Sequence, residues 1–354
     1  MARSPKLIPA LFRLGRTSLR QSTRLGKAVA RRGLDDGQTL AKAARIAMSG
    51  VARPAPPPPP RPAGGRWYEG RWGPGPLAMR HYRLFIPTGA TARRPLPLLV
   101  LLHGCAQDAA TFAASTHAAR TARDRHFAVL MPEQAREANP QRCWNWFGTP
   151  AQVELEVLIL MSLVERVQAL YPRCRGPLFA LGISAGGAIA TTLALHRPTH
   201  FTAVGSHSGA APESAVTPLQ AAQAMQGRRS PDLNRVRDLL RGSLPPPLIL
   251  IHGDADGVVA PGNASATADL WRATLSAGTP LGESRGEIRR GTRLPCQRHD
   301  WRHNGRPWLR VITIHGLGHA WSGGAAGFAF SEPRGPDALK LAWQFFAATM
   351  EESS

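Results

Sequence analysis

The segment with the clearest chemical potential is Gly182-Ile183-Ser184-Ala185-Gly186, which places a serine midway between two glycines. An apolar run precedes it and a helix-like run follows, so Ser184 is expected at a sharp turn from a strand into a helix. At such a turn, a Cβ two residues before or after the serine would collide with a neighbouring strand or helix. Because the turn lifts the hydroxyl out of the sheet, Ser184 is the candidate nucleophile. An ordinary tight turn is the alternative.

A serine hydroxyl needs a base that accepts its proton and an acid that orients the base. In the fold that uses this turn, the acid and then the base follow the serine along the chain. The apolar run 248–251 ends in a loop with Asp254 and Asp256, one of which is the expected acid. The run 309–314 ends in a Gly-rich loop with His319, the expected base. Alternatively, the aspartates cap a turn or helix, and His319 is a packed or surface residue.

Acyl transfer also requires N–H donors for the negative charge that develops on the substrate carbonyl oxygen. Ala185 follows the nucleophile and should supply one backbone N–H. The second is expected from Cys105, because Gly104 lets the chain turn after the apolar run 98–102. The alternative for Cys105 is a turn that ends a strand and has no catalytic role.

These loops need a scaffold that brings several strand ends to one edge. From residue 66 onward, short apolar runs alternate with helix-like stretches, which indicates an α/β fold with a mainly parallel central sheet and helices on both faces. Asn304-Gly305 predicts the tight turn of a hairpin over 298–314. The expected strands are residues 66–72, 77–87, 96–102, 127–131, 177–183, 201–205, 247–252 and 308–315, and the expected helices are residues 109–124, 153–171, 185–196, 219–225, 262–276 and 337–349.

The positive charge is concentrated in the first part of the chain. The 354 residues hold 44 Lys and Arg against 23 Asp and Glu, a net charge of +21, of which residues 1–66 carry +12. Residues 1–51 are expected to form a basic tail with helix-like leucine spacing, residues 52–65 a proline-rich linker, and residues 66–354 the catalytic domain. Such a tail would bind an anionic granule or membrane surface through residues 1–50. A solvated tail is the alternative. Nucleic acid is disfavoured, because residues 1–51 contain a single aromatic, Phe12, among their arginines and no recognisable nucleic-acid module.

Several classes of protein are disfavoured by what the sequence lacks. No run of ~18 consecutive apolar residues occurs, so a membrane-spanning helix is not expected. Arginines interrupt every apolar core near the start, so no standard secretory signal is expected and a cytoplasmic or granule-associated location is favoured. Cys296, His299 and His303 lie close together, but no second cluster supplies the remaining ligand of a zinc site. No glycine-rich loop followed by Lys-Ser or Lys-Thr occurs, so a phosphate-binding loop is not expected either. Neither a metal nor another cofactor is therefore expected.

Six short blocks of the sequence, in their order along the chain, resemble the poly(3-hydroxybutyrate) (PHB) depolymerase-type esterases of the α/β-hydrolase fold. This family also includes feruloyl and acetylxylan esterases. The resemblance runs from about residue 98 to residue 346. The basic tail and proline linker have no counterpart in the secreted members, and the insert 282–295 is more basic than the family pattern. The blocks are LLHGCAQ at 101–107, PEQ at 132–134 with CWNWF at 143–147, GISAGG at 182–187, VGSHSG at 204–209, HGDAD at 252–256 and GHAWSGG at 318–324.

The resemblance implies an α/β-hydrolase fold in which Ser184, Asp256 and His319 are nucleophile, acid and base, and Cys105 and Ala185 are the backbone donors. It favours Asp256 over its neighbour at 254, because in this fold the acid lies just before an apolar pair. It also implies a serine esterase for short-chain hydroxyacyl esters, foremost poly- or oligo(3-hydroxybutyrate). Carbohydrate esters are the alternative substrates, since they use the same machinery. An extracellular location also stays open on this resemblance.

Two further expectations concern the loops around this site. Trp144, Trp146 and Trp321 lie in loops and would line a substrate groove, or else they are packing aromatics. Cys105 and Cys143 lie in blocks expected at the active-site edge, and a disulfide between them would pin one loop to the other. The four cysteines allow three complete pairings, so the sequence leaves this choice open.

Overall fold

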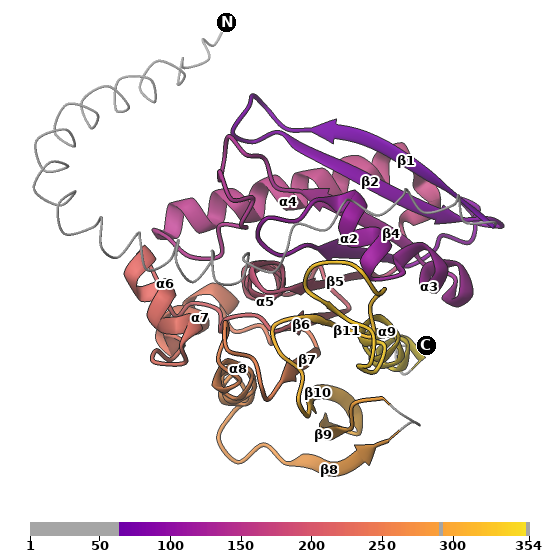
Figure 1. Ribbon diagram of the computed structural model, residues 1–354. Coiled ribbons are helices and arrows are strands. Elements are labelled where there is room, and N and C mark those ends of the chain that lie inside the picture. Colours follow the sequence, from indigo (N-terminus) through magenta and orange to yellow (C-terminus); the bar gives the residue numbers. More distant parts are fainter. Residues whose placement is uncertain (1–63, 290–292, 352–354) are drawn as a thin grey trace, which may run out of the picture. The chain divides into compact units, whose positions relative to one another are not determined.

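The computed structural model describes residues 64–289 and 293–351. The predicted tail and nearly all of the proline linker lie outside the described residues. A ten-stranded sheet in the order β1-β2-β4-β3-β5-β6-β7-β10-β9-β8 forms the centre of the described part (Figure 1). Each strand pair from β4 to β10 is parallel, and the pairs at the two ends are antiparallel. The predicted mainly parallel sheet is therefore confirmed.

The central strands are buried along their whole length. Every residue of β3, β5, β6 and β7 is buried, as continuous apolar runs predict for strands covered on both faces. The strands are β1 Gly65–Trp72, β2 Arg80–Pro87, β3 Leu98–Leu102, β4 Ala128–Glu133, β5 Leu178–Ile183, β6 Ala203–His207, β7 Leu248–Gly253, β8 Leu281–Ile288, β9 Cys296–His303 and β10 Arg306–Ile314, with a separate short pair β11 Trp321–Ser322 and β12 Ser331–Glu332.

Helices cover both faces of this sheet and form two separate cores. One core contains buried side chains of α4, α5, α6, α7 and α8, and the other contains those of α2, α3 and α9. No helix of residues 64–289 and 293–351 is long and apolar enough to cross a membrane. The helices are α2 Ala109–Ser115, α3 Ala118–Arg125, α4 Pro150–Leu170, α5 Ala185–His196, α6 Pro218–Met225, α7 Leu233–Leu240, α8 Gly262–Ala273 and α9 Ala338–Glu351, with a short 3-10 turn at Pro172–Cys174.

Three elements of the structure differ from the prediction. The single helix predicted over 109–124 is wrong, because His117 has φ 54° and breaks it into α2 and α3. Helix α7 and strand β8 were not predicted. The hairpin turn is confirmed: Asn304 and Gly305, with φ 51° and 78°, connect β9 to β10.

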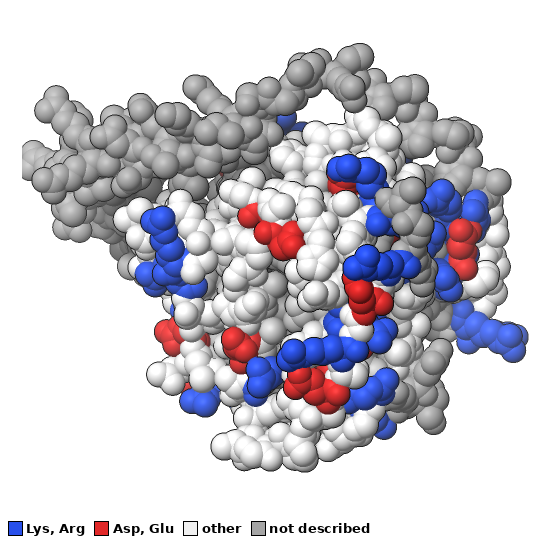
Figure 2. All heavy atoms as spheres, turned by 60° about the horizontal axis from the view of Figure 1, so that its bottom comes forward, with Lys and Arg blue, Asp and Glu red and all other residues white. Residues whose placement is uncertain are grey.

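Strand β8 contains residues 282–288 of the basic insert. It lies at the edge of the sheet, where Arg285 pairs with Glu283 and Arg289 pairs with Glu287. Figure 2 shows acidic side chains interspersed with basic ones on the face that includes this end of the sheet. A charged edge strand disfavours pairing with another chain, which gives the charged residues 283–289 of the insert a structural explanation.

The carboxyl ends of the central strands lie at the same level of the sheet. Leu102 of β3 pairs with Gly182 of β5, and His207 of β6 pairs with Ile183 of β5. Gly253 of β7 pairs with Ile314 of β10. The loops after these strands therefore meet along one edge, which is where sheets of this kind place their functional residues.

Candidate active site

Ser184 occupies the predicted turn between β5 and α5. Its backbone has φ 56° and ψ −123°, a strained combination for a residue with a side chain. The N–H of Ser184 donates to the carbonyl oxygen of His207 over 2.9 Å, which anchors the turn to β6. The side chain is partly exposed and does not cap the helix. The hydroxyl is therefore presented at the sheet edge.

The two glycines that flank Ser184 are required by close backbone packing. A Cβ on Gly182 would lie 2.3 Å from the carbonyl carbon of Gly186. A Cβ on Gly186 would lie 2.2 Å from the carbonyl oxygen of Leu102 in β3. Both distances are far below van der Waals contact, so the predicted steric reason for the glycines is confirmed.

His319 and Asp256 form a hydrogen-bonded pair at this edge. His319 Nδ1 lies 2.8 Å from Asp256 Oδ2, and the aspartate side chain is completely buried. The other oxygen, Oδ1, accepts the backbone N–H groups of Val258 and Val259, each over 2.9 Å. With Nδ1 held by the carboxylate, His319 keeps Nε2 as the nitrogen that can accept a proton.

Asp256 is ionised despite its burial. Burial raises the pKa of its carboxyl group, but hydrogen bonds from His252 and His319 outweigh that effect and hold the pKa below its usual range. His252 Nε2 lies 3.4 Å from Asp256 Oδ2 and 2.9 Å from the carbonyl oxygen of Val259. A buried carboxylate with this many donors is stabilised in its charged form.

Asp254, the competing acid, pairs with a different histidine. Its carboxylate lies 2.8 Å from His315 Nδ1 and accepts the backbone N–H of Gly316 over 2.7 Å. The Asp254 side chain is 42% exposed. Asp254 thus holds the start of the loop that carries His319 but makes no contact with that ring among the described hydrogen bonds.

The expected N–H donors lie on two braced segments. Cys105 forms a disulfide with Cys143, one of the pairings that the sequence left open. Ala185 is the first residue of α5, where the backbone N–H has no acceptor within the helix. Within residues 64–289 and 293–351, the backbone N–H groups of Cys105 and Ala185 donate to no protein acceptor. They are free to bind a ligand oxygen.

Buried side chains fix the loop that contains Cys105. The indole N–H of Trp144 donates to the carbonyl oxygen of His103 over 2.9 Å. His103 Nε2 accepts the N–H of Gln134 over 3.2 Å, and its Nδ1 lies 2.7 Å from the carbonyl oxygen of Gly104. Burial lowers the pKa of His103 to about 4, so the ring is neutral and acts as a fixed donor and acceptor.

The three tryptophans pack inside the protein. Trp144, Trp146 and Trp321 are 0%, 6% and 1% exposed, so the prediction that they line a groove is wrong. Trp321 lies in β11, and the loop of Trp144 and Trp146 folds back onto the core, neither of which the sequence position reveals. The aromatic ring near the candidate base is instead Phe330, whose centroid lies 6.4 Å from that of His319. Nothing in the sequence distinguished Phe330.

His207 connects the serine turn with the loop that carries His319. Its carbonyl oxygen accepts the Ser184 N–H, its Nε2 accepts the Ser322 N–H over 3.2 Å, and its ring stacks on Trp321. Burial lowers its pKa to about 3, which leaves the ring neutral. The sequence block VGSHSG contained this residue, but its role required the fold.

A buried ion pair between β2 and α4 holds the segments that contain Gln134 and Asn145. Arg80 of β2 and Glu156 of α4 lie 2.8 Å apart, with side chains 1% and 2% exposed. Glu156 also accepts hydrogen bonds from Gln134 over 3.1 Å and Asn145 over 2.7 Å. Breaking a buried pair of this kind is strongly destabilising, because the remaining charge has no partner.

A metal site is not assembled by the described residues. No group of three or more His, Cys, Asp or Glu side chains within residues 64–289 and 293–351 could hold an ion. Cys296 and His299 are an odd number of residues apart on β9, so their side chains point to opposite faces of the sheet. His299 contacts Glu283 instead.

Comparison with known proteins identifies the family. The family described as "Esterase PHB depolymerase" matches residues 80–288, more than half of the chain. The chain belongs to the PHB depolymerase esterase family. The matched region includes Ser184 and Asp256, whereas His319 follows it.

Two curated relatives are similar over most of this chain. Poly(3-hydroxyalkanoate) depolymerase C of Paucimonas lemoignei is 28% identical over 264 residues, 70% of this chain and 59% of the relative. Poly(3-hydroxybutyrate) depolymerase of Ralstonia pickettii is 24% identical over 68% of this chain and 51% of the relative. The chain thus spans between half and three fifths of the length of these relatives.

Solved structures of esterases share the fold. Acetyl xylan esterase from Aspergillus awamori superposes with a TM-score of 0.61 at 16% identity, covering 80% of this chain and 99% of that one. An S-formylglutathione hydrolase from Agrobacterium tumefaciens gives a TM-score of 0.50 at 15% identity, covering 74% and 91%. At these identities the likeness concerns the fold, and it confirms the predicted α/β-hydrolase fold.

Proposed function

We propose that this member of the PHB depolymerase esterase family is a serine esterase that hydrolyses short-chain hydroxyacyl esters, foremost poly- or oligo(3-hydroxybutyrate). The observation that carries the proposal is the pair of His319 with a buried, ionised Asp256 at the sheet edge where Ser184 is partly exposed on its strained turn. The free N–H groups of Cys105 and Ala185 at the same edge add the donors that acyl transfer requires.

In the proposed mechanism, Ser184 Oγ attacks the ester carbonyl carbon while His319 Nε2 accepts the hydroxyl proton. Asp256 keeps the other proton of the ring on Nδ1 and stabilises the imidazolium that forms. The N–H groups of Cys105 and Ala185 bind the oxygen that becomes negative. His319 then returns the proton to the departing alcohol. Water, activated by the same histidine, attacks the acyl-enzyme and releases the acid.

The polyester substrate is supported by the names of the curated relatives, which are a poly(3-hydroxyalkanoate) and a poly(3-hydroxybutyrate) depolymerase. Residues 1–50 are proposed to bring the enzyme to an anionic granule or membrane surface. This part of the proposal rests on the charge of +12 in residues 1–66.

A substrate panel tests the proposal. Purified protein is incubated separately with amorphous PHB, 3-hydroxybutyrate oligomers, acetylated xylan and feruloyl sugar esters, and the released acids are quantified. We expect release from the hydroxybutyrate esters and none from Ser184→Ala protein. Release from the sugar esters alone would refute the substrate assignment, while equal activity of the Ser184→Ala protein would refute the mechanism.

A further inference from the structure

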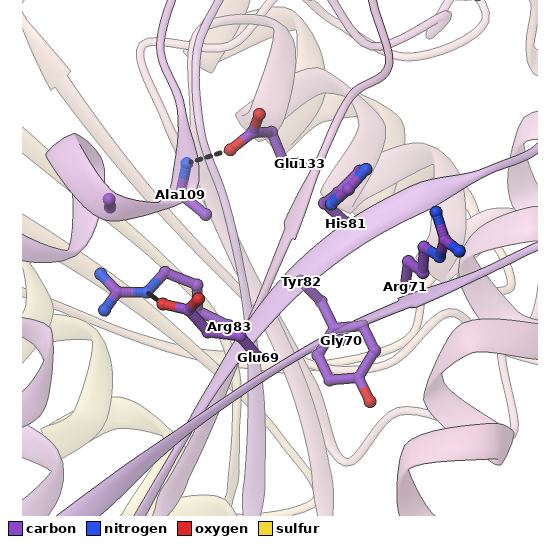
Figure 3. A pocket seen from close by; sticks show the side chains of 9 residues that line it. Glu69, Gly70, Arg71, His81, Tyr82, Arg83, Ala109 and Glu133 are labelled. Atoms are coloured by element: carbon purple, nitrogen blue, oxygen red, sulfur yellow. Dashed lines mark hydrogen bonds and ion pairs between the residues drawn. The ribbon is translucent and has the colours of Figure 1, made fainter. Parts of the chain in front are cut away.

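A cavity of about 460 Å³ opens at the β1 end of the sheet, on strands that the proposed mechanism does not use. Its walls are side chains of β1, β2 and β4 together with the first residues of α2 (Figure 3). Helix α2, which contributes residues to the cavity wall, directly follows the loop of Cys105 in the sequence. The residues that matter for its chemistry are Glu69, Arg71, His81, Arg83 and Glu133.

The charged side chains of the cavity project from one face of three neighbouring strands. Strand pairing places Arg71 opposite His81, Glu69 opposite Arg83, and His81 opposite Glu133. Figure 3 shows the side chains of Arg71, His81 and Glu133 on the same side of the sheet. The cavity therefore gathers groups that lie far apart in the sequence.

Two of these five side chains have no partner among residues 64–289 and 293–351. Arg83 Nε lies 2.9 Å from Glu69 Oε1. Glu133 accepts the backbone N–H of Ala109 over 3.1 Å and forms an ion pair with Arg142. Within the described residues, no hydrogen bond or ion pair engages the exposed side chains of Arg71 and His81. The donors available to a ligand are thus a guanidinium group and an imidazole, a combination suited to a carboxylate.

The cavity lies at the same edge as the candidate nucleophile. Val100 pairs with Leu130 and Leu102 pairs with Gly182, so the register places Glu133 level with the residue before Ser184. β2 and β1 are the third and fourth strands from β5 in the sheet order. At a strand spacing of ~4.8 Å, His81 and Arg71 lie roughly 14 and 19 Å along the edge from the serine turn.

We propose that this cavity binds the free carboxylate at the end of a hydroxyacyl oligomer while Ser184 attacks an ester bond further along the same oligomer. The inference rests on the proposed esterase function and adds the end group that the enzyme recognises. Each 3-hydroxybutyrate unit contributes four backbone bonds, which extend about 5 Å at the ~1.2 Å per bond of an extended chain. The separation then corresponds to three or four units.

The reaction fixes which part of the oligomer occupies the cavity. The ester carbonyl that Ser184 attacks belongs to the acyl segment, which ends in a hydroxyl group. The segment that leaves as an alcohol carries the free carboxylate at its other end. The cavity therefore holds the leaving segment, and hydrolysis, with one water consumed, first releases a carboxylate-ended product of three or four units.

The test compares free-acid oligomers with their methyl esters, from the dimer to the hexamer. For the native protein we expect KM to be about tenfold lower for the free acid from the pentamer upward and equal for the two forms of the dimer, which cannot reach the cavity. Arg71→Gln and His81→Gln should remove this preference and leave kcat/KM for p-nitrophenyl butyrate unchanged. Arg93→Gln, which changes an exposed arginine outside the cavity, is the matched control and should keep the preference.

Equal KM values for both forms at every length, or a preference that survives Arg71→Gln and His81→Gln together, would overturn the inference. Calorimetric titration of Ser184→Ala protein with the pentamer acid and its methyl ester measures binding without turnover. Tighter binding of the acid, lost on Arg71→Gln, supports the cavity, and equal binding refutes it. Absence of ester hydrolysis by the native protein would instead refute the proposed function, so the two failures are distinguishable.

Discussion

Replacing Asp256 by asparagine should disable the enzyme through the tautomer of His319 rather than through a loss of structure. Asp256 Oδ1 accepts two backbone N–H groups at 2.9 Å, and Oδ2 lies 2.8 Å from His319 Nδ1. Asparagine has the same shape but only one oxygen. Its amide can therefore satisfy the backbone or the histidine in the native manner, but not both.

The cost of each orientation decides the outcome. If the amide oxygen faced His319, its NH2 group would face the N–H groups of Val258 and Val259 and leave both without an acceptor. The buried N–H of Val259 costs ~1–3 kcal/mol when it is unpaired, and the partly buried N–H of Val258 adds to this, so this orientation is disfavoured by at least ~1–3 kcal/mol. The oxygen therefore stays with the backbone, the NH2 group faces Nδ1, and His319 carries its proton on Nε2. In that tautomer it cannot accept the proton of Ser184.

The expected loss of kcat is about 10⁴-fold, as for a triad histidine held in the wrong tautomer. It corresponds to about 5.4 kcal/mol of activation free energy at ~1.36 kcal/mol per decade. The assay is hydrolysis of p-nitrophenyl butyrate, with thermal unfolding as the check on folding. Asp254→Asn is the matched control, because Asp254 contacts His315 and Gly316 instead, and it should retain activity within about tenfold. A slower Asp254→Asn enzyme, or an Asp256→Asn enzyme within tenfold of native, would refute the reasoning.

Three further outcomes are expected, two from the structure and one from the charge of the N-terminal sequence. Gly186→Ala should abolish activity and lower Tm, because its Cβ would lie 2.2 Å from a carbonyl oxygen of β3, whereas Gly257→Ala, with no atom within 4 Å, should change the free energy of unfolding by less than about 0.5 kcal/mol. Burial lowers the pKa values of His103 and His207 to about 4 and about 3, so the unfolded chain binds their protons first and stability is lost as pH falls from about 6 to about 4. Urea titrations over this range should show a slope of roughly 2.7 kcal/mol per pH unit from the two rings, and a flat profile would contradict their buried, neutral state. Full-length protein should sediment with anionic vesicles at low salt and dissociate near 0.5 M salt, where the Debye length is about 4 Å, while protein without residues 1–65 should stay in the supernatant; equal sedimentation of both would exclude the tail as the binding segment.

The main features of the fold could be predicted from the sequence because burial leaves a direct pattern. β3, β5 and β7 appear as continuous apolar runs, and the Ser184 turn carries glycines that its tight backbone packing demands. The break between α2 and α3 was missed, because His117 adopts a left-handed conformation that its residue type does not reveal. β8 was missed because its sequence, rich in glycine and charge, lacks the apolar alternation of a half-buried strand.

The candidate site was only partly predictable for a similar reason. Ser184 was named from its flanking glycines and His319 from its place in a loop, whereas loop position left Asp254 and Asp256 both open and the family resemblance favoured Asp256. Position cannot show whether a side chain is buried or which partner it has. The three tryptophans illustrate this limit, since all three are buried although they were predicted to lie in exposed loops. The neutral rings of His103 and His207 acquire their roles only through contacts between segments distant in sequence.

Labelling with a serine-directed phosphonate tests the central claim most directly. The native protein is treated with a fluorophosphonate, digested and analysed by mass spectrometry, in parallel with Ser184→Ala protein. We expect one adduct, on Ser184, in proportion to the loss of esterase activity, and none on the variant. An adduct on another residue that accompanies inactivation, or undiminished labelling of the Ser184→Ala protein, would contradict it.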